Sequence, residues 1–246
     1  MRSTDIAVGI TTCEREPSTY VETRESIEEA GFNVAYVQKD VNKELGSYGC
    51  FKKVLEALIQ KSAEAVLIFQ DDIEVTRNLA TILEKIITPK IWNDRTGVIS
   101  LYTACAHHNE TGGWHKLDPC KGSNFYGALA VLLPMPVARH FIAAPPGPGA
   151  MTLTDFWLGT FCESLHLDVW MPSPSFVYHT GTVSTIENMW PKDHIAKYRQ
   201  CYAFCADALA MDLNLSAFTQ LRSADALRPS TTSYPSPGQS RSEHPL

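Results

Sequence analysis

Two neighbouring aspartates, Asp71 and Asp72, follow directly on the apolar run AVLIF at 65–69. A run of this length and composition predicts a short buried strand, so both carboxylates should lie at its carboxyl end. Adjacent carboxylates repel each other unless a positive group compensates their charge. A hard cation such as Mg²⁺ or Mn²⁺ takes carboxylate oxygens as ligands and keeps phosphate oxygens as its others. The alternative is that both acids cap the next helix, near Thr76.

The segments around this pair alternate between strands and amphipathic helices, and this order predicts an α/β protein with a mostly parallel central sheet flanked by helices. Ligands of such sheets bind beyond the carboxyl ends of the strands, where Thr11 and Thr12 should join the two aspartates. The expected strands are residues 5–10, 32–38, 65–69 and 98–102.

The second half of the chain is less regular. From Pro229 onward it is rich in Ser, Pro and Thr without apolar periodicity, which predicts a disordered tail over 229–246. We therefore expect a single domain over residues 1–228. Its expected later elements are a polar loop at 103–124, a strand at 125–134, and helices at 154–167 and 193–213.

The composition limits the kinds of partner. A net charge of −6 and a pI near 5.7 argue against broad nonspecific binding to nucleic acid or anionic membranes, but do not exclude a local basic groove. No apolar run reaches the ~18 residues that span a bilayer, and the N-terminus lacks a signal-peptide pattern. We therefore expect a cytoplasmic protein. The seven cysteines are scattered without a CxxC pair, which favours reduced core thiols over a disulfide framework.

Three short motifs follow one another along the chain: VGITTCER at 8–15, FQDD at 69–72 and PSFVYHTGTVS at 174–184. In this order they resemble the nucleotide-sugar-dependent glycosyltransferases of the GT-A fold (family 2-like). QDD resembles the DxD motif of that family, with Gln70 in place of its first acid. The resemblance implies that Asp72 is the main ligand of a Mn²⁺ or Mg²⁺ ion. It also implies that Asp71 contacts the ribose or the water shell of the metal.

The resemblance divides the chain into a nucleotide-sugar-binding half, 1–102, and an acceptor-binding half, 103–228. It places Thr11, Thr12 and Arg15 against a donor, with a UDP-sugar expected. Arg15 could form charged hydrogen bonds to phosphate, and the alternative is an ordinary surface arginine.

Asp40 and His179 also take their implied roles from the resemblance. Asp40 resembles the acid that reads the nucleoside in many family members, and a turn aspartate is the alternative. His179 resembles a further metal ligand, for which a neutral imidazole is competent; a hydrogen-bonded loop histidine is the alternative. Gly181 and Ser184, in the loop after His179, could close over the diphosphate.

An inverting transfer needs a base that deprotonates the acceptor. Asp155, at the start of the predicted helix 154–167, resembles the catalytic acid of inverting members in its position. The helix dipole would keep it ionised, and this stabilisation is also its alternative role. Glu163, two turns along the same helix, is a weaker candidate. Trp114 and Trp157 are expected at the acceptor, with Trp114 as a stacking platform.

The loop at 103–124 also holds residues that could be read as a zinc cluster, but their spacing matches none of the common zinc patterns. These residues are Cys105, His107, His108, His115 and Cys120.

Together these features predict a metal-dependent glycosyltransferase. Its acceptor could be a glycan, a lipid-linked sugar, a peptide, a metabolite or a modified DNA base. One alternative is a nucleotidyltransferase or sugar-nucleotide pyrophosphorylase, although GITTCEREP is not the Gly-rich basic loop usual there. The other alternative is a noncatalytic module that binds nucleotide sugars.

Overall fold

Strands and helices alternate through the first hundred residues, as the sequence pattern predicts. The computed structural model describes residues 5–15, 18–104, 112–117, 125–145, 153–180, 201 and 204–208. The elements are β1 (Ile6–Cys13), α1 (Tyr20–Glu29), β2 (Val34–Asp40), α2 (Gly46–Leu58), β3 (Ala65–Gln70), β4 (Ile73–Val75), α3 (Leu79–Ile86), β5 (Thr96–Ser100), β6 (Gly113–Leu117), β7 (Ala130–Pro134), α4 (Met135–Ala143), α5 (Thr154–Ser164), β8 (Asp168–Ser173) and β9 (Val177–His179).

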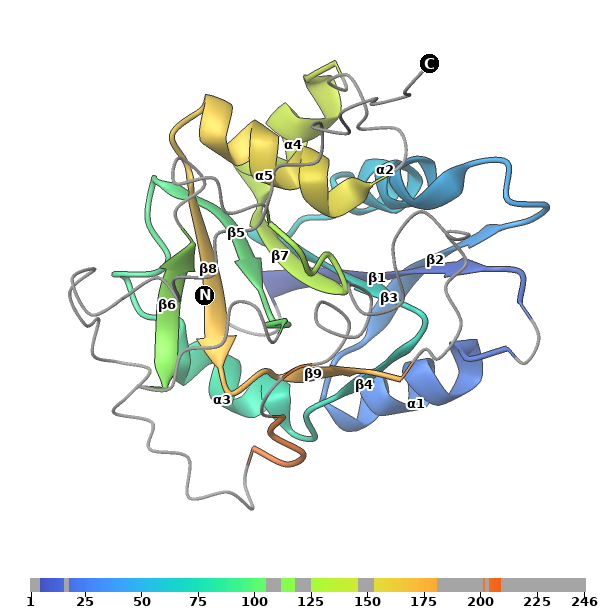
Figure 1. Ribbon diagram of the computed structural model, residues 1–246, viewed down its shortest axis with the longest axis horizontal. Coiled ribbons are helices and arrows are strands. Elements are labelled where there is room, and N and C mark those ends of the chain that lie inside the picture. Colours follow the sequence, from blue (N-terminus) through green and yellow to red (C-terminus); the bar gives the residue numbers. More distant parts are fainter. Residues whose placement is uncertain are drawn as a thin grey trace, which may run out of the picture.

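The central sheet has seven strands in the order β2-β1-β3-β7-β5-β8-β6 (Figure 1). β2, β1, β3, β5 and β8 run in one direction, and β7 and β6 run in the other. The expected mostly parallel sheet is therefore confirmed. The strand expected at 125–134 is shorter, because only Ala130–Pro134 forms β7. This strand is antiparallel to both of its neighbours, β3 and β5.

Helices cover both faces of the sheet, with α1 and α3 on one face and α2, α4 and α5 on the other (Figure 1). Consecutive residues of a strand point to opposite faces, so β3 supplies both layers of the core. Leu67 and Phe69 pack in the layer of α1 and α3, whereas Val66 and Ile68 pack in the layer of α2 and α4. A strand buried on both faces needs the continuous apolar run that the sequence shows at this point.

A second, two-stranded sheet joins β4 to β9 in antiparallel pairing. Ile73 pairs with His179, so the end of β9 lies beside the turn that follows β3. The hydroxyl of Thr23, on α1, makes two hydrogen bonds to this turn. It donates to the carbonyl of Asp71 at 2.8 Å and accepts the N–H of Ile73 at 3.2 Å. The turn that carries the two aspartates is thus fixed by a strand on one side and a helix on the other.

The segment that leads into β7 lies beside the carboxyl end of β3, because the two strands are antiparallel. The N–H of Gln70 donates to the carbonyl of Leu129 at 2.8 Å. Two residues earlier, Gly127 has a φ of +129°, and a Cβ there would lie 2.9 Å from the ring of Tyr102. Both observations mean that this position accommodates only glycine without local rearrangement.

None of the helices in the described part of the chain has the length and apolar character needed to cross a membrane. The expected tail at 229–246 and most of the expected helix at 193–213 lie outside the described residues.

Candidate functional site

Asp71 and Asp72 occupy the turn between β3 and β4, at the carboxyl end of a buried strand, where the apolar run at 65–69 predicts them. Both are buried, with 3% and 8% of their surface exposed. Buried carboxylates need compensation from hydrogen bonds or opposite charge, so their partners define the site.

Asp71 is held by the end of β1. Its Oδ2 accepts the Thr12 hydroxyl at 2.6 Å and the N–H of Cys13 at 3.4 Å, and its Oδ1 forms an ion pair with Arg15. Burial raises the pKa of Asp71, and the bond from Thr12 and the charge of Arg15 offset only part of this effect. The neighbouring Thr11, paired with Gln70 across the strands, donates its hydroxyl to the carbonyl of Phe69 at 3.3 Å.

Asp72 joins three segments that are far apart in the sequence. Its Oδ2 lies 3.0 Å from Nη1 of Arg15 and 3.1 Å from Nε2 of His179. Its carbonyl accepts the N–H of Thr180 at 2.9 Å. Burial alone would raise the pKa of Asp72, but the hydrogen bond and charge of His179, followed by Arg15, outweigh burial and lower this pKa to about 2. Asp72 is therefore an anion at every ordinary pH.

Two buried polar atoms at this point have no hydrogen-bond partner among the described residues: Oδ1 of Asp72 and Nε of Arg15. Each such atom costs about 1–3 kcal/mol if nothing satisfies it. The first accepts and the second donates, so a bare cation would satisfy only Asp72 and a bare anion only Arg15. A cation that carries anionic oxygens, such as a metal-bound phosphate, satisfies both.

The donor set fits a hard divalent ion only in part. Asp72 supplies a carboxylate, which suits Mn²⁺ or Mg²⁺, and His179 supplies an imidazole, which suits the transition metal Mn²⁺ better than Mg²⁺. Over the described ranges, no cluster of three or more His, Cys, Asp or Glu side chains could hold a metal ion. An ion at this site would therefore take its remaining ligands from water and phosphate, as Mg²⁺ commonly does.

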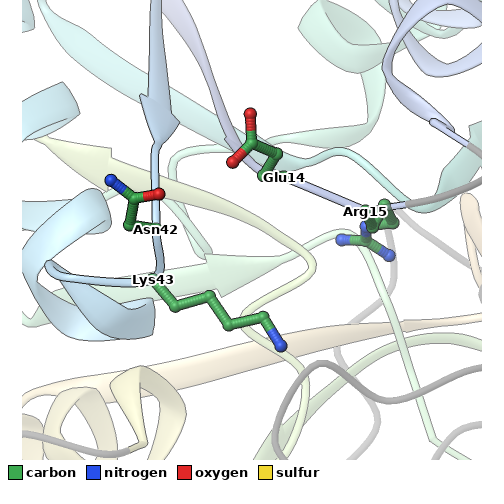
Figure 2. A pocket seen from close by; sticks show the side chains of 4 residues that line it. All are labelled: Glu14, Arg15, Asn42 and Lys43. Carbon is green, nitrogen blue, oxygen red and sulfur yellow. The ribbon is translucent and has the colours of Figure 1, made fainter.

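A cavity of about 330 Å³ opens beside the two aspartates. Glu14 and Arg15 line it from the end of β1, and Asn42 and Lys43 line it from the turn after β2 (Figure 2). Asn42 and Lys43 both have left-handed backbone conformations, with φ of 59° and 56°. The cavity lies beyond the carboxyl ends of two parallel strands, which is the usual place for a ligand in such a sheet.

Asp40, expected to read the nucleoside, is a turn residue in the structure. Only 4% of its surface is exposed, and its two carboxylate oxygens accept the N–H groups of Leu45 and Gly46 at 2.9 and 2.8 Å. The alternative role is therefore the one that the structure favours. Asp40 fixes the loop that carries Asn42 and Lys43, and the sequence pattern did not single out these two lining residues.

Asp155 lies in the first turn of α5 and is half-buried. Burial raises its pKa, and hydrogen bonds from the backbone of Phe156 and Gly127 offset only part of this effect. The bond from Phe156 measures 3.0 Å. A hydrogen bond of 2.7 Å between Ser47 and Thr154 sets the N-termini of α2 and α5 side by side, so Asp155 lies near the loop that lines the cavity.

Trp114, expected as a stacking platform at the acceptor, is buried in the core. Its ring is 5% exposed, its indole N–H donates to the carbonyl of Ile86 at 2.9 Å, and it packs edge-on against Phe176. Trp157 is partly buried and packs against Phe141 and Phe161, between α4 and α5.

Several expected residues lie outside the described part of the chain, namely Gly181, Ser184, Cys105, His107, His108 and Cys120. His115, the remaining residue of the zinc alternative, is buried in β6. Thr23, which holds the aspartate turn, was not predicted. The sequence gives only a weak signal for this role, namely a small polar residue on the buried face of α1.

No protein-family model matches the sequence, and no curated protein matches it either. Among solved structures, GalNAc-T7 in complex with UDP, GalNAc and Mn²⁺ is similar over 75% of this chain and 45% of its own, with 11% identity and a TM-score of 0.50. A Drosophila β-1,4-galactosyltransferase 7 variant with manganese, UDP-Gal and xylobiose is similar over 79% of this chain and 81% of its own, with 8% identity and a TM-score of 0.43.

A CMP:2-keto-3-deoxy-manno-octonic acid synthetase in complex with CTP is similar over 68% of this chain and 88% of its own, with 7% identity and a TM-score of 0.39. At these identities the likeness concerns the fold. The chain has the GT-A type of α/β fold, and it spans less than half the length of GalNAc-T7.

Proposed function

We propose that this protein is a glycosyltransferase that moves a sugar from a nucleotide-sugar donor, with a UDP-sugar expected, to an acceptor hydroxyl with the help of Mn²⁺ or Mg²⁺. The observation that carries this proposal is the pair of unsatisfied buried atoms at the ends of β1 and β3. Oδ1 of Asp72 is free to bind a cation or accept a hydrogen bond, and Nε of Arg15 is free to donate to an anionic oxygen, among the described residues. A metal-bound diphosphate supplies both.

The proposed donor site uses residues from four segments. Asp72 and His179 would hold the ion. Thr12 would keep the Asp71 carboxylate in place beside it, and Arg15 would bind the diphosphate. A bound divalent ion acts as a Lewis acid that stabilises the negative charge developing on the diphosphate as the glycosidic bond breaks. Thr11 lies at the rim where the ribose is expected, and Gly181 and Ser184 remain proposed contacts to the phosphates.

Asp155 is the proposed base of an inverting transfer. Its carboxylate accepts the proton of the acceptor hydroxyl while the acceptor oxygen bonds to the anomeric carbon and the bond from that carbon to the diphosphate breaks. A pKa raised by burial suits this role, because a more basic carboxylate takes up a proton more readily. The backbone bonds from Phe156 and Gly127 hold the carboxylate in one orientation.

A donor screen tests the proposal directly. Thermal stabilisation and slow donor hydrolysis are measured with UDP-, GDP- and TDP-sugars, each with Mn²⁺, with Mg²⁺ and with EDTA. We expect one nucleotide class to stabilise the protein with metal and not with EDTA. Absence of binding by every nucleotide sugar with either metal would refute the proposal. Release of pyrophosphate from a nucleoside triphosphate and a sugar would instead identify a nucleotidyltransferase.

A further inference from the structure

We infer that Arg15 is a resident counter-ion of the Asp71–Asp72 pair, which a divalent cation displaces only when a diphosphate is present to receive the guanidinium. The inference rests on the proposed function, since the diphosphate is that of the proposed donor. It adds a coupling between the two ligands: the metal binds weakly alone and more tightly when the nucleotide is present.

The first support is that Arg15 occupies the place where a cation is needed. Its two terminal nitrogens contact both aspartates, Nη2 at Asp71 and Nη1 at Asp72. Its side chain is only 15% exposed, so the guanidinium is a buried part of the site. The planar fork of arginine matches two neighbouring carboxylates in a way that a lysine ammonium does not.

The second support is that Arg15 also lines the cavity beside the aspartates, together with Lys43 (Figure 2). The side chain therefore has space to move into without a change of the backbone. Its Nε, which has no partner among the described residues, already offers a donor for an anionic oxygen. A diphosphate in the cavity would give the displaced guanidinium better partners than it has now.

The third support is the balance of charge. The two carboxylates and the one guanidinium together carry one net negative charge. A divalent ion added to this group would make the net charge positive and set two cations against the same two carboxylates, which is unfavourable in a buried place. The two negative charges of a diphosphate restore the original balance. Metal and diphosphate should thus bind with positive coupling.

The test measures Mn²⁺ binding to the full chain by isothermal titration calorimetry, with and without UDP, in the wild type and in Arg15→Gln. In the wild type we expect UDP to tighten Mn²⁺ binding roughly 10-fold or more. In Arg15→Gln we expect Mn²⁺ alone to bind roughly 10-fold tighter than in the wild type, and UDP to add little. Arg24→Gln is the matched control, because Arg24 pairs with Glu28 on the exposed face of α1.

A second readout is the melting temperature without metal. Arg15→Gln should melt lower than the wild type, because two buried carboxylates lose their counter-ion, and Mn²⁺ should restore it. If Arg15→Gln does not fold, Arg15→Lys keeps one charge without the fork and should give an intermediate Mn²⁺ affinity.

Equal Mn²⁺ affinity of the wild type and the Arg15 variants would overturn the inference. So would UDP binding that persists in EDTA and is lost in Arg15→Gln, because Arg15 would then be the permanent cation of the site. The measurement with Mn²⁺ alone requires no nucleotide. Its outcome therefore distinguishes failure of this inference from failure of the proposed function, which the donor screen tests.

Discussion

The turn after β3 and the first turn of α5 each carry a buried or half-buried aspartate, and the two surroundings act on it in opposite ways. At Asp72 the ring of His179 and the guanidinium of Arg15 outweigh burial and lower the pKa to about 2. At Asp155 burial outweighs the backbone hydrogen bonds and raises the pKa. One side chain is fixed as an anion and the other is primed to take up a proton.

This difference matches the two roles that are proposed for Asp72 and Asp155. A permanent anion suits the binding of a cation, whereas a carboxylate of raised pKa suits proton transfer. The surroundings follow from the fold. The turn after β3 meets the ends of two other strands that bring opposite charge, while the hydrogen bonds that act on Asp155 come from the backbone of Phe156 and Gly127. The following predictions test whether the two roles are truly separate.

The largest expected effect is that of Asp155→Asn on turnover. Loss of the proposed base should lower kcat roughly 10³-fold, within the range for a general base, and leave the Kd of the donor nearly unchanged. Steady-state kinetics and calorimetry with the donor measure the two quantities. A parallel loss of donor affinity would mean that Asp155 also contributes to donor binding. A large loss of kcat in Glu163→Gln, without one in Asp155→Asn, would identify Glu163 as the base.

Next is the effect of Asp72→Asn on donor binding. Loss of a carboxylate ligand should weaken metal-dependent donor binding about 100-fold, at least as much as loss of a group that only orients a ligand. Asp71→Asn should cost less, because the carboxylate of Asp71 is already occupied by Thr12, Cys13 and Arg15. Calorimetry with UDP and Mn²⁺ measures both variants. Equal losses of donor affinity in the two variants would mean that Asp71 and Asp72 contribute equally to metal-dependent binding.

A smaller effect is expected from Lys43→Gln at the cavity. An exposed lysine near phosphate contributes up to about 1 kcal/mol, so the KM for the donor should rise roughly 2- to 5-fold without a change in kcat. The effect should shrink at high ionic strength, because an exposed charge is screened by salt. Lys53→Gln is the control, since Lys53 pairs with Glu56 on the surface of α2. The same rise in KM in both variants would mean that Lys43 makes no specific contact with the donor.

The smallest expected effects are on stability, and they have opposite signs. A pKa raised in the folded state means that the charged form of Asp155 disfavours folding, so stability rises as pH falls through that pKa. The lowered pKa of Asp72 adds stability above its unfolded value of about 3.9, which is lost as pH falls toward 2.

At pH 7.5 without metal, Asp155→Asn should therefore raise the melting temperature and Asp72→Asn should lower it, each by about 2–4 °C, or about 1 kcal/mol. Differential scanning calorimetry measures both. Shifts of the same sign would contradict the opposed surroundings described above.

The meeting of Asp71, Asp72 and Thr12 at one rim of the sheet could be predicted from the sequence. The run at 65–69 ends in Asp71 and Asp72, and the ends of parallel strands meet at one rim, so Thr12 had to lie close. His179 could be placed there only through the resemblance, because the pairing of β4 with β9 joins residues about a hundred positions apart. No local pattern announces such a pairing.

Other features could not be predicted, for physical reasons. Whether Arg15 faces solvent or the aspartates depends on the geometry of the turn, and either is compatible with its place after β1. The surroundings of Asp40 and Trp114 could not be predicted, because a polar or aromatic residue near an expected site has the same local signal when it caps a loop or fills the core. The direction of β7 depends on long-range pairing, so its apolar run alone could not reveal the reversal.

The antiparallel direction of β7 also limits the distance between Asp155 and the turn after β3. If β7 were parallel to β3, the chain that leaves β7 would lie beside the carboxyl end of β3. Because β7 is antiparallel, the chain that enters β7 lies there instead. Gly127 binds the proposed base Asp155, and Leu129 binds Gln70, the residue before the aspartate pair. Two residues of extended chain span at most about 7 Å. This short backbone segment therefore limits the distance between Asp155 and the turn that carries Asp71 and Asp72, and a change in its length would shift one relative to the other.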